Sequence, residues 1–213
     1  MSIVIGVMLR KTKDRIYATA EHLTLKLNDN VIVETEHGIE FGIICENEKY
    51  IEEKGFQANK ILRKMTGDDK IRLIKNKMKI LKIQKIVEQK ASEHGLGMKL
   101  TCVQHTFDCS KLFVYYTSET RIDFRGLIKD LGRILKTRIQ MVQIGVRDES
   151  KMLGGLGTCG QVLCCQKFLK DFNSITIDMT KEQDLSLNTA KLSGLCGRLK
   201  CCIFYENDTY KDA

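Results

Sequence analysis

The chain has 213 residues, of which 43% are apolar and 29% charged, and it holds 35 Lys plus Arg against 27 Asp plus Glu. This is the composition of an ordinary globular protein, and it excludes the disordered and fibrous classes. The longest uncharged stretch, residues 152–166, is short and contains several Gly and Gln residues, so we expect no membrane insertion. The first ten residues lack the order of a secretory signal, which favours a cytoplasmic protein.

The N-terminal segment, residues 1–60, predicts a small antiparallel β-barrel. Turn signals occur at residues 28–30 and 37–38. Between them, β-branched residues alternate with polar ones, which is the pattern of half-buried strands. The strands predicted in this way cover residues 3–8, 15–20, 30–36 and 39–45. Four or five such strands in about fifty residues are typical of a small barrel.

The central segment, residues 61–147, predicts the element order α-β-β-α-β. A helix is expected from Asp68, a plausible N-cap, to His94, and Gly95 provides its stop signal. Two strands joined by a short loop follow, then a helix capped by Asp123, and then one more strand. The expected ranges of the three strands are 98–107, 111–117 and 138–146. This order is typical of a sheet with helices on one face.

The C-terminal segment, residues 148–213, is rich in Gly, Cys and Leu and predicts only short elements. One strand is expected at 174–179 and one helix near 201–207. The fold class predicted for the whole chain is therefore α+β, with an N-terminal barrel, a central layer and a Cys-rich C-terminal region.

The positive charge is concentrated in one predicted helix. Residues 60–100 hold 12 basic and 4 acidic side chains, an excess equal to the net charge of +8 of the whole chain. A solvated helix face is the simplest interpretation. The alternatives are that the helix contacts RNA or an acidic partner protein. The residues expected to make that contact are Lys75, Lys79 and Lys82. The helix lacks the aromatic residues on which single-strand binders stack bases, which weakens the RNA interpretation.

Six of the nine cysteines belong to a duplicated motif, G-x-C-G-x-x-x-C-C. The copies begin at Gly157 and Gly194, are offset by 37 residues, and are each followed by an aromatic residue, Phe168 or Phe204. If the two copies pack as a pair, six thiols lie within reach of a common centre. The six are Cys159, Cys164, Cys165, Cys196, Cys201 and Cys202.

Thiolates are the ligands that zinc and iron–sulfur clusters prefer, so the motif predicts a metal or cluster site. A subset of the six is expected to ligate, because such centres usually take four ligands. Two alternatives remain open. The cysteines could form a core of small apolar side chains, or they could carry out thiol redox chemistry without a metal.

The cysteine-rich region resembles a known family. Two runs carry the likeness: KMLGGLGTCGQVLCCQKFL and KEQDLSLNTAKLSGLCGRLKCCIFYE. They resemble the YaaT/RicT group of bacterial proteins with the polymerase-suppressor-protein (PSP) C-terminal domain, and the likeness covers nearly the whole chain. That domain would correspond to about residues 62–147. Thr158 and Thr189 stand where the family pattern has proline.

The resemblance implies a non-enzymatic subunit of a cytosolic complex. It implies two small helical partner proteins and a [4Fe-4S] cluster ligated by cysteines of the complex, including some of the six above. It further implies an influence on RNA maturation by endoribonuclease Y and, in spore formers, on a developmental phosphorelay. A zinc-stabilised RNA-binding protein that uses the basic helix is the alternative, and a thiol enzyme is the least favoured hypothesis.

Overall fold

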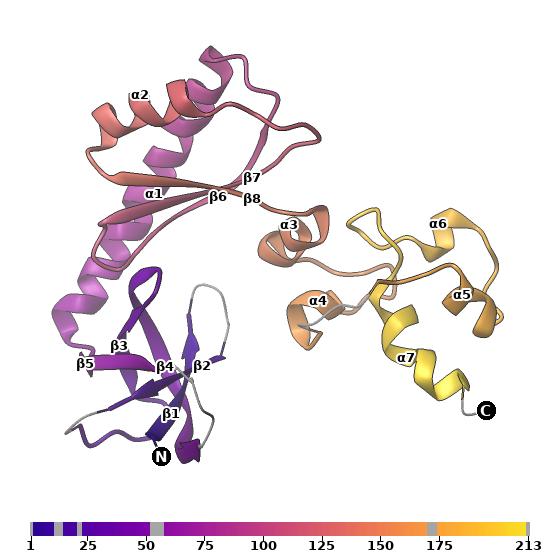
Figure 1. Ribbon diagram of the computed structural model, residues 1–213, viewed down its shortest axis with the longest axis horizontal. Helices are drawn as coiled ribbons and strands as arrows, with labels where there is room; N and C mark the ends of the chain where they lie inside the picture. The colour runs from indigo at the N-terminus through magenta and orange to yellow at the C-terminus, as the bar shows by residue number, and fades with distance from the viewer. Residues whose placement is uncertain (1, 11–14, 21–22, 52–57, 170–173, 212–213) are drawn as a thin grey trace. The chain divides into compact units, whose positions relative to one another are not determined.

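The computed structural model describes residues 2–10, 15–20, 23–51, 58–169 and 174–211. It is a mixed α+β fold with two sheets and several helices, as the sequence predicts (Figure 1). Its strands are β1 (Ser2–Leu9), β2 (Arg15–Thr19), β3 (Asn30–Thr35), β4 (Gly38–Ile51), β5 (Asn59–Lys64), β6 (Lys99–His105), β7 (Lys111–Thr117) and β8 (Arg138–Gln143). Its helices are α1 (Gly67–Glu93), α2 (Arg125–Leu135), α3 (Val146–Leu153), α4 (Cys164–Lys167), α5 (Asp178–Glu182), α6 (Thr189–Leu192) and α7 (Cys201–Lys211). Within the described ranges, none of these helices has the length and apolar character needed to cross a bilayer.

The five N-terminal strands form a closed ring in the order β1-β2-β5-β3-β4. Most neighbours are antiparallel, and β2 pairs with β5 in parallel. Alternation places one set of side chains inside, where they are buried: Ile5, Val7, Ala18, Val31, Val33, Ile44 and Ile61. The four strands predicted from sequence are all present. The strand β5 that completes the ring lacks a comparable apolar alternation, since only Ile61 of its six residues is buried.

Helix α1 is attached to the tip of the β6–β7 hairpin. The Asn76 side-chain amide donates to the carbonyl of Phe107 at 3.3 Å, and the Arg72 guanidinium lies 5.4 Å from the centre of the Phe107 ring. The Phe107 backbone N–H in turn donates to the carbonyl of Ile39 in β4 at 2.8 Å. One hairpin tip therefore links the barrel to the long helix.

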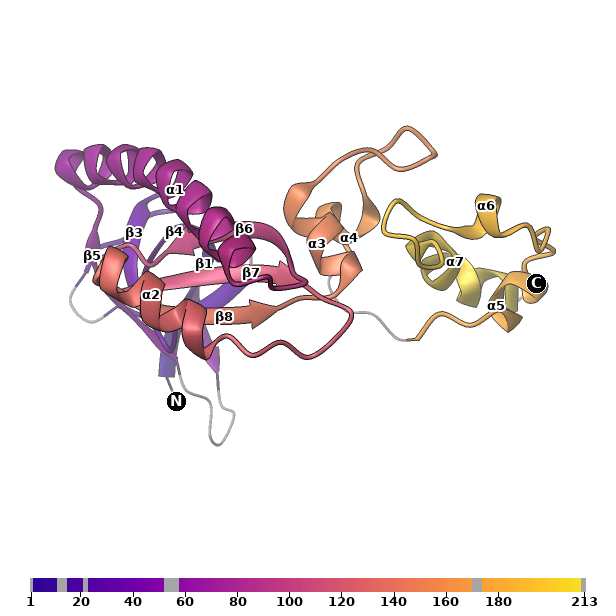
Figure 2. The same cartoon turned by 90° about the horizontal axis from the view of Figure 1, so that it is seen from above.

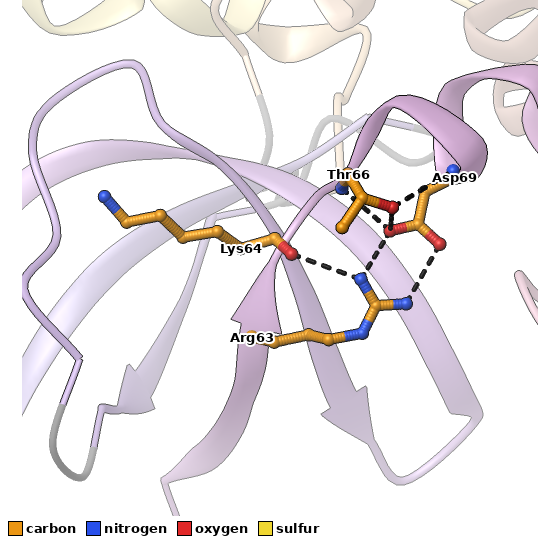
Figure 3. Close-up of polar contacts among 4 residues, drawn as sticks. All are labelled: Arg63, Lys64, Thr66 and Asp69. Atoms are coloured by element: carbon orange, nitrogen blue, oxygen red, sulfur yellow. Dashed lines mark hydrogen bonds and ion pairs between the residues drawn. The ribbon is translucent and has the colours of Figure 1, made fainter.

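The N-terminus of α1 is closed by a capping box on Thr66, not by Asp68 as the sequence suggested (Figure 3). The Thr66 N–H donates to Asp69 Oδ2 at 2.9 Å, and the Asp69 N–H donates back to the Thr66 hydroxyl. Arg63 of β5 approaches the same carboxylate with both terminal nitrogens, one of them 2.9 Å from Oδ1. Asp69 completes the capping box, and Asp68 does not, because Asp69 lies three residues after Thr66, where its carboxylate can accept from the Thr66 N–H.

The far end of α1 packs against α2 (Figures 1 and 2). Val87 and Ala91 are buried, as are Leu127 and Leu131 of α2. His94 Nε2 lies 2.9 Å from Asp130 Oδ2 at the edge of this contact. Strands β6, β7 and β8 form a three-stranded sheet in that order.

Two expectations about strands are wrong, one in the C-terminal segment and one at the end of the central segment. The strand expected at 174–179 is not formed, and helix α5 begins within that range at Asp178. There the Thr180 hydroxyl donates to the Ile177 carbonyl at 2.6 Å, and Thr180 is fully buried while Ile177 is 58% exposed. The strand expected to reach Val146 ends at Gln143, because Gly145 serves as the N-cap of α3.

The chain divides into two compact units. The first comprises residues 1–97, 102–114 and 121–142, and the second comprises residues 98–101, 115–120 and 143–213. The boundary passes through the three-stranded sheet. The division into three segments at residues 60 and 147 therefore stays a prediction.

Replacing Asp69 by Ala should lower the free energy of unfolding by about 2 kcal/mol, because it removes a capping box and a charge-assisted contact with Arg63. Urea unfolding measures this loss. Asp68→Ala is the matched control on the same turn, and it should cost only about 0.5 kcal/mol through the helix dipole. Equal losses in the two variants would contradict the assignment of the cap.

The contribution of Asp69 should also depend on pH with a defined sign. The Arg63 contact holds the pKa of the Asp69 carboxyl well below its usual range. The stabilisation is therefore complete above the ordinary carboxyl pKa of about 3.9 and is lost as the pH falls toward the folded value. The difference in stability between wild type and Asp69→Ala should accordingly be constant from pH 7 to 5 and shrink below pH 4.

Candidate functional site

The two copies of the cysteine motif fold into the same loop. In the first copy Leu156 bridges Val162, and in the second Ser193 bridges Leu199, each antiparallel. The Gly157 N–H donates to the carbonyl of Gln161 at 2.8 Å, and 37 residues later the Gly194 N–H donates to Arg198 with the same length. The sequence repeat is therefore also a structural repeat, with Cys159 and Cys196 at equivalent positions in the two loops.

The glycine after the first cysteine is required by backbone conformation. Gly160 has a φ of 76° and Gly197 a φ of 75°, both in the left-handed region that L side chains rarely adopt. A Cβ at either position would meet nothing within 4 Å, so space does not explain the choice. These two glycines turn each loop back so that the paired cysteines can follow.

The paired cysteines open a helix in both copies. Cys164 and Cys165 begin α4, and Cys201 and Cys202 begin α7. The two helices contact each other. The Phe168 and Tyr205 rings meet edge to face beside them, with 5.0 Å between centroids. Tyr205 is the true counterpart of Phe168, since it lies 37 residues later, and this corrects the sequence-based choice of Phe204.

All six motif cysteines line one pocket of about 130 Å³ within the second unit. Cys165 is buried, Cys159 is exposed, and the other four are partly buried. Apolar side chains, among them Val162, Leu163 and Leu195, complete the lining. The structure thus brings together every cysteine that the motif singled out, although their role as ligands stays a prediction.

The pocket contains the sulfur donors of a metal centre, but these donors are not arranged around one common point. In the part of the chain that the structure describes, no three His, Cys, Asp or Glu side chains are placed to hold one metal ion. The sulfur donors fit soft metals. Gly157 and Gly194 lie against two of the thiols, since a Cβ there would be 3.4 Å from Cys159 Sγ and 3.9 Å from Cys196 Sγ.

The thiols influence one another across the two copies. Burial raises the pKa of the Cys201 thiol to about 11, and charge on Cys165, Cys164 or Cys196 would add to the rise. Burial and then the neighbouring Cys196 raise the pKa of Cys165 in the same way. A cluster of thiols with raised pKa values stays protonated at neutral pH, and a bound cation would relieve the repulsion between thiolates.

Arg147 is a site residue that the sequence analysis did not identify. Its guanidinium donates to the carbonyl of Leu199 at 3.3 Å, and its charge lowers the pKa values of Cys165 and Cys201 against the effect of burial. It lies 12 residues before the first motif cysteine, so no spacing within the motif points to it. Arg147 thus anchors the second loop and adds positive charge near the thiols.

The structure places the lysines proposed for RNA or partner contact on helix α1. Lys75, Lys79 and Lys82 belong to α1 in the first unit, and all three are exposed. The basic helix and the cysteine pocket therefore belong to different compact units of the chain.

Metal binding in the pocket should become tighter as the pH rises, because the metal must displace protons from thiols whose pKa values are raised. We expect the affinity for Zn²⁺, used as a probe, to increase at least about tenfold per pH unit between pH 6.5 and 7.5. Competition with a metal indicator measures it. Cys102→Ser lies outside the pocket and should keep the same slope, and an affinity independent of pH would contradict thiol ligation.

Thr189→Pro should stabilise the chain. Thr189 is the first residue of α6, where proline is favoured, and Asn188 before it is already extended, with φ −75° and ψ 113°. Fixing φ in the unfolded chain is worth about 0.4–1 kcal/mol. Calorimetry should therefore show a Tm increase of about 1–4 °C. Thr180→Pro is the contrasting variant, and it should destabilise because it removes a buried hydroxyl and the N–H that donates to Ile177.

Comparison with known proteins identifies the family. Residues 59–144 match the model of the PSP1 C-terminal conserved region, and residues 174–213 match that of the third domain of PSP1-like proteins. Stage 0 sporulation protein YaaT of Bacillus subtilis (strain 168) is 46% identical over 212 residues, which cover 99% of this chain and 77% of the relative. No solved structure matches.

Two yeast proteins show shorter similarities. An uncharacterised protein of Schizosaccharomyces pombe is 27% identical over 151 residues, covering 57% of this chain and 20% of that protein. Protein PSP1 of Saccharomyces cerevisiae is 43% identical over 53 residues, covering 25% of this chain and 6% of that protein. The family matches and the near full-length similarity to YaaT together show that the chain belongs to the PSP1 family as a YaaT-like member.

Proposed function

We propose that this chain is a non-enzymatic regulatory subunit that holds a [4Fe-4S] cluster together with partner chains and adjusts RNA maturation by endoribonuclease Y. The observation that carries the proposal is the convergence of six cysteines from two motif copies on one pocket. Iron–sulfur clusters are held by Cys thiolates, usually four, so the pocket offers a sufficient donor set from one chain or a shared one.

The surroundings of the pocket support a shared site. Leu156 and Leu195 are each 62% exposed, and Phe168 and Tyr205 are 48% and 61% exposed. Exposed apolar groups of this size beside a ligand pocket mark an interaction surface. Partner proteins that cover these groups would shield the cluster from water and could supply ligands of their own.

The state of the thiols supports a binding role over a catalytic one. Reactive cysteines need a lowered pKa, since the thiolate is the nucleophile. Burial raises the pKa values of Cys164, Cys165, Cys201 and Cys202 in the absence of a metal. These groups are therefore suited to ligating a cation and poorly suited to attack on a substrate.

A regulatory role follows from the coupling between cluster and assembly. The Bacillus subtilis relative is named as a stage 0 sporulation protein, and we extend to this chain a role upstream of RNA maturation and, in a spore former, of the developmental phosphorelay. Loss of the cluster removes the ligand bonds that hold the pocket and its partners together. Oxygen and iron supply would then control the amount of intact complex.

Anaerobic purification of the chain alone and with its co-purifying partners tests the proposal. We expect visible absorbance and about four irons and four sulfides per cluster in the complex, both lost in Cys196→Ser and Cys201→Ser. Cys102→Ser is the matched control, because Cys102 is also a partly buried cysteine but does not line the pocket. A colourless complex with stoichiometric zinc, or full iron content in both pocket variants, would refute cluster ligation.

A further inference from the structure

Helix α1 carries a row of exposed apolar side chains on the surface of the first unit. Ile71, Ile74, Met78 and Leu81 are 52%, 62%, 66% and 67% exposed. Their spacing of three, four and three residues is that of the a and d positions of two heptads. We call these four residues the α1 seam. A seam of this kind is the half of a helix–helix contact that is normally covered by a partner helix.

The seam lies on the face of α1 that its own unit does not use. The buried residues of the helix are Asp69, Asn76, Val87 and Ala91. Met78 and Val87 are nine residues apart, which is about two and a half helical turns, so their side chains point in opposite directions. The helix is therefore fixed to the fold by one face and presents the seam on the other.

Lysines flank the seam on both sides. Lys70 and Lys77 precede a positions by one residue, and Lys75 and Lys82 follow d positions by one, so all four occupy the g and e positions of the heptads. All four are exposed, and residues 70–85 contain no acidic side chain. In coiled coils, residues at e and g select the partner by charge.

The charge pattern decides between the candidate occupants. A second copy of α1 would place lysine against lysine in either orientation, since every flanking position has the same sign. RNA would satisfy the lysines but leave the apolar row against phosphates, and α1 offers no aromatic side chain for stacking on bases. A helix with apolar a and d residues and acidic e and g residues would cover the apolar seam and pair with the flanking lysines at the same time.

We propose that the α1 seam is the docking surface for an acidic amphipathic α-helix of another protein. The partner helix packs its apolar row on Ile71, Ile74, Met78 and Leu81 and directs its Glu or Asp side chains to the four lysines. The contact covers about three helical turns, so the partner segment is about 12 residues or longer.

Two designed 21-residue peptides test the proposal with the full-length chain. Both carry Leu at a and d, and they differ only in having Glu or Lys at every e and g position. Fluorescence anisotropy at low salt should show binding of the Glu peptide roughly a hundredfold tighter than that of the Lys peptide, because four attractive pairs replace four repulsive ones. This preference should weaken as salt is raised.

Two variants localise the binding. Met78→Glu should weaken binding of the Glu peptide at least about tenfold, whereas Ile134→Glu, at an exposed apolar position on α2, should leave it unchanged. The double variant Lys75→Glu, Lys82→Glu should reverse the preference toward the Lys peptide. Because Met78 is exposed, Met78→Glu should keep the wild-type Tm, which separates loss of binding from loss of folding.

Three results would overturn the proposal. The first is equal affinity for the Glu and Lys peptides. The second is a self-associating chain whose sedimentation becomes monomeric in Met78→Glu, which would make a second copy the occupant. The third is tighter binding of a 20-nucleotide single-stranded RNA that Lys75→Glu, Lys82→Glu abolishes and Met78→Glu does not, which would make the surface an RNA site.

Discussion

The mutual proximity of six thiols is the constraint on which the C-terminal region depends. Among its described residues, the buried apolar side chains are Cys165, Leu169, Leu192 and Ile203, which is a small core. A region with so little buried apolar area gains much from cross-links such as metal–ligand bonds. Without such bonds the thiols must remain protonated to share one pocket, because ionising more than one of them places like charges together.

Hydrogen bonds supply part of what this small core lacks. The Gln183 side-chain amide donates to the Ile203 carbonyl at 2.7 Å and to Asn207 Oδ1 at 3.2 Å. The Asn207 amide donates to Glu182 at 3.1 Å. Both Gln183 and Asn207 are buried, so this network fixes α5 against the second cysteine helix, α7, in a specific arrangement. The second pair of cysteines is therefore positioned by α5 as well as by its own loop.

The sequence could predict the features that are set by local pattern. Alternation predicted the first four barrel strands, and the repeat singled out the six cysteines that line one pocket. The mixed α+β class was confirmed, with two sheets and several helices. The cap was misplaced by two residues, because Thr66 and Asp68 are both acceptable N-cap residues by type, and only the contacts of Asp69 with Thr66 and Arg63 show which of the two is used.

The features that the sequence could not predict depend on tertiary contacts. Arg147 belongs to the pocket through a bond to Leu199, 52 residues away, which no local spacing encodes. The β-branched run at 175–177 favours a strand, yet no neighbouring strand pairs with it among the described residues, and Thr180 packs as part of a short helix instead. Helix α1 shows the same limit. Its apolar residues recur at near-helical spacing, but only the packed structure separates the buried Val87 from the exposed Met78.

The two units thus differ in how complete they are as folded bodies. The barrel closes its core with its own strands, and Arg63 and Thr66 join that core to α1 through Asp69. The α1 seam is therefore an exposed surface on a unit that folds around its own core. We expect this unit to stay folded when no partner covers the seam. The cysteine loops have the opposite character, because their small core and clustered thiols leave the arrangement of the site dependent on what binds there. On the two proposals made above, a partner helix would remain on the stable unit, whereas assembly at the cysteine loops would respond to the supply of a metal.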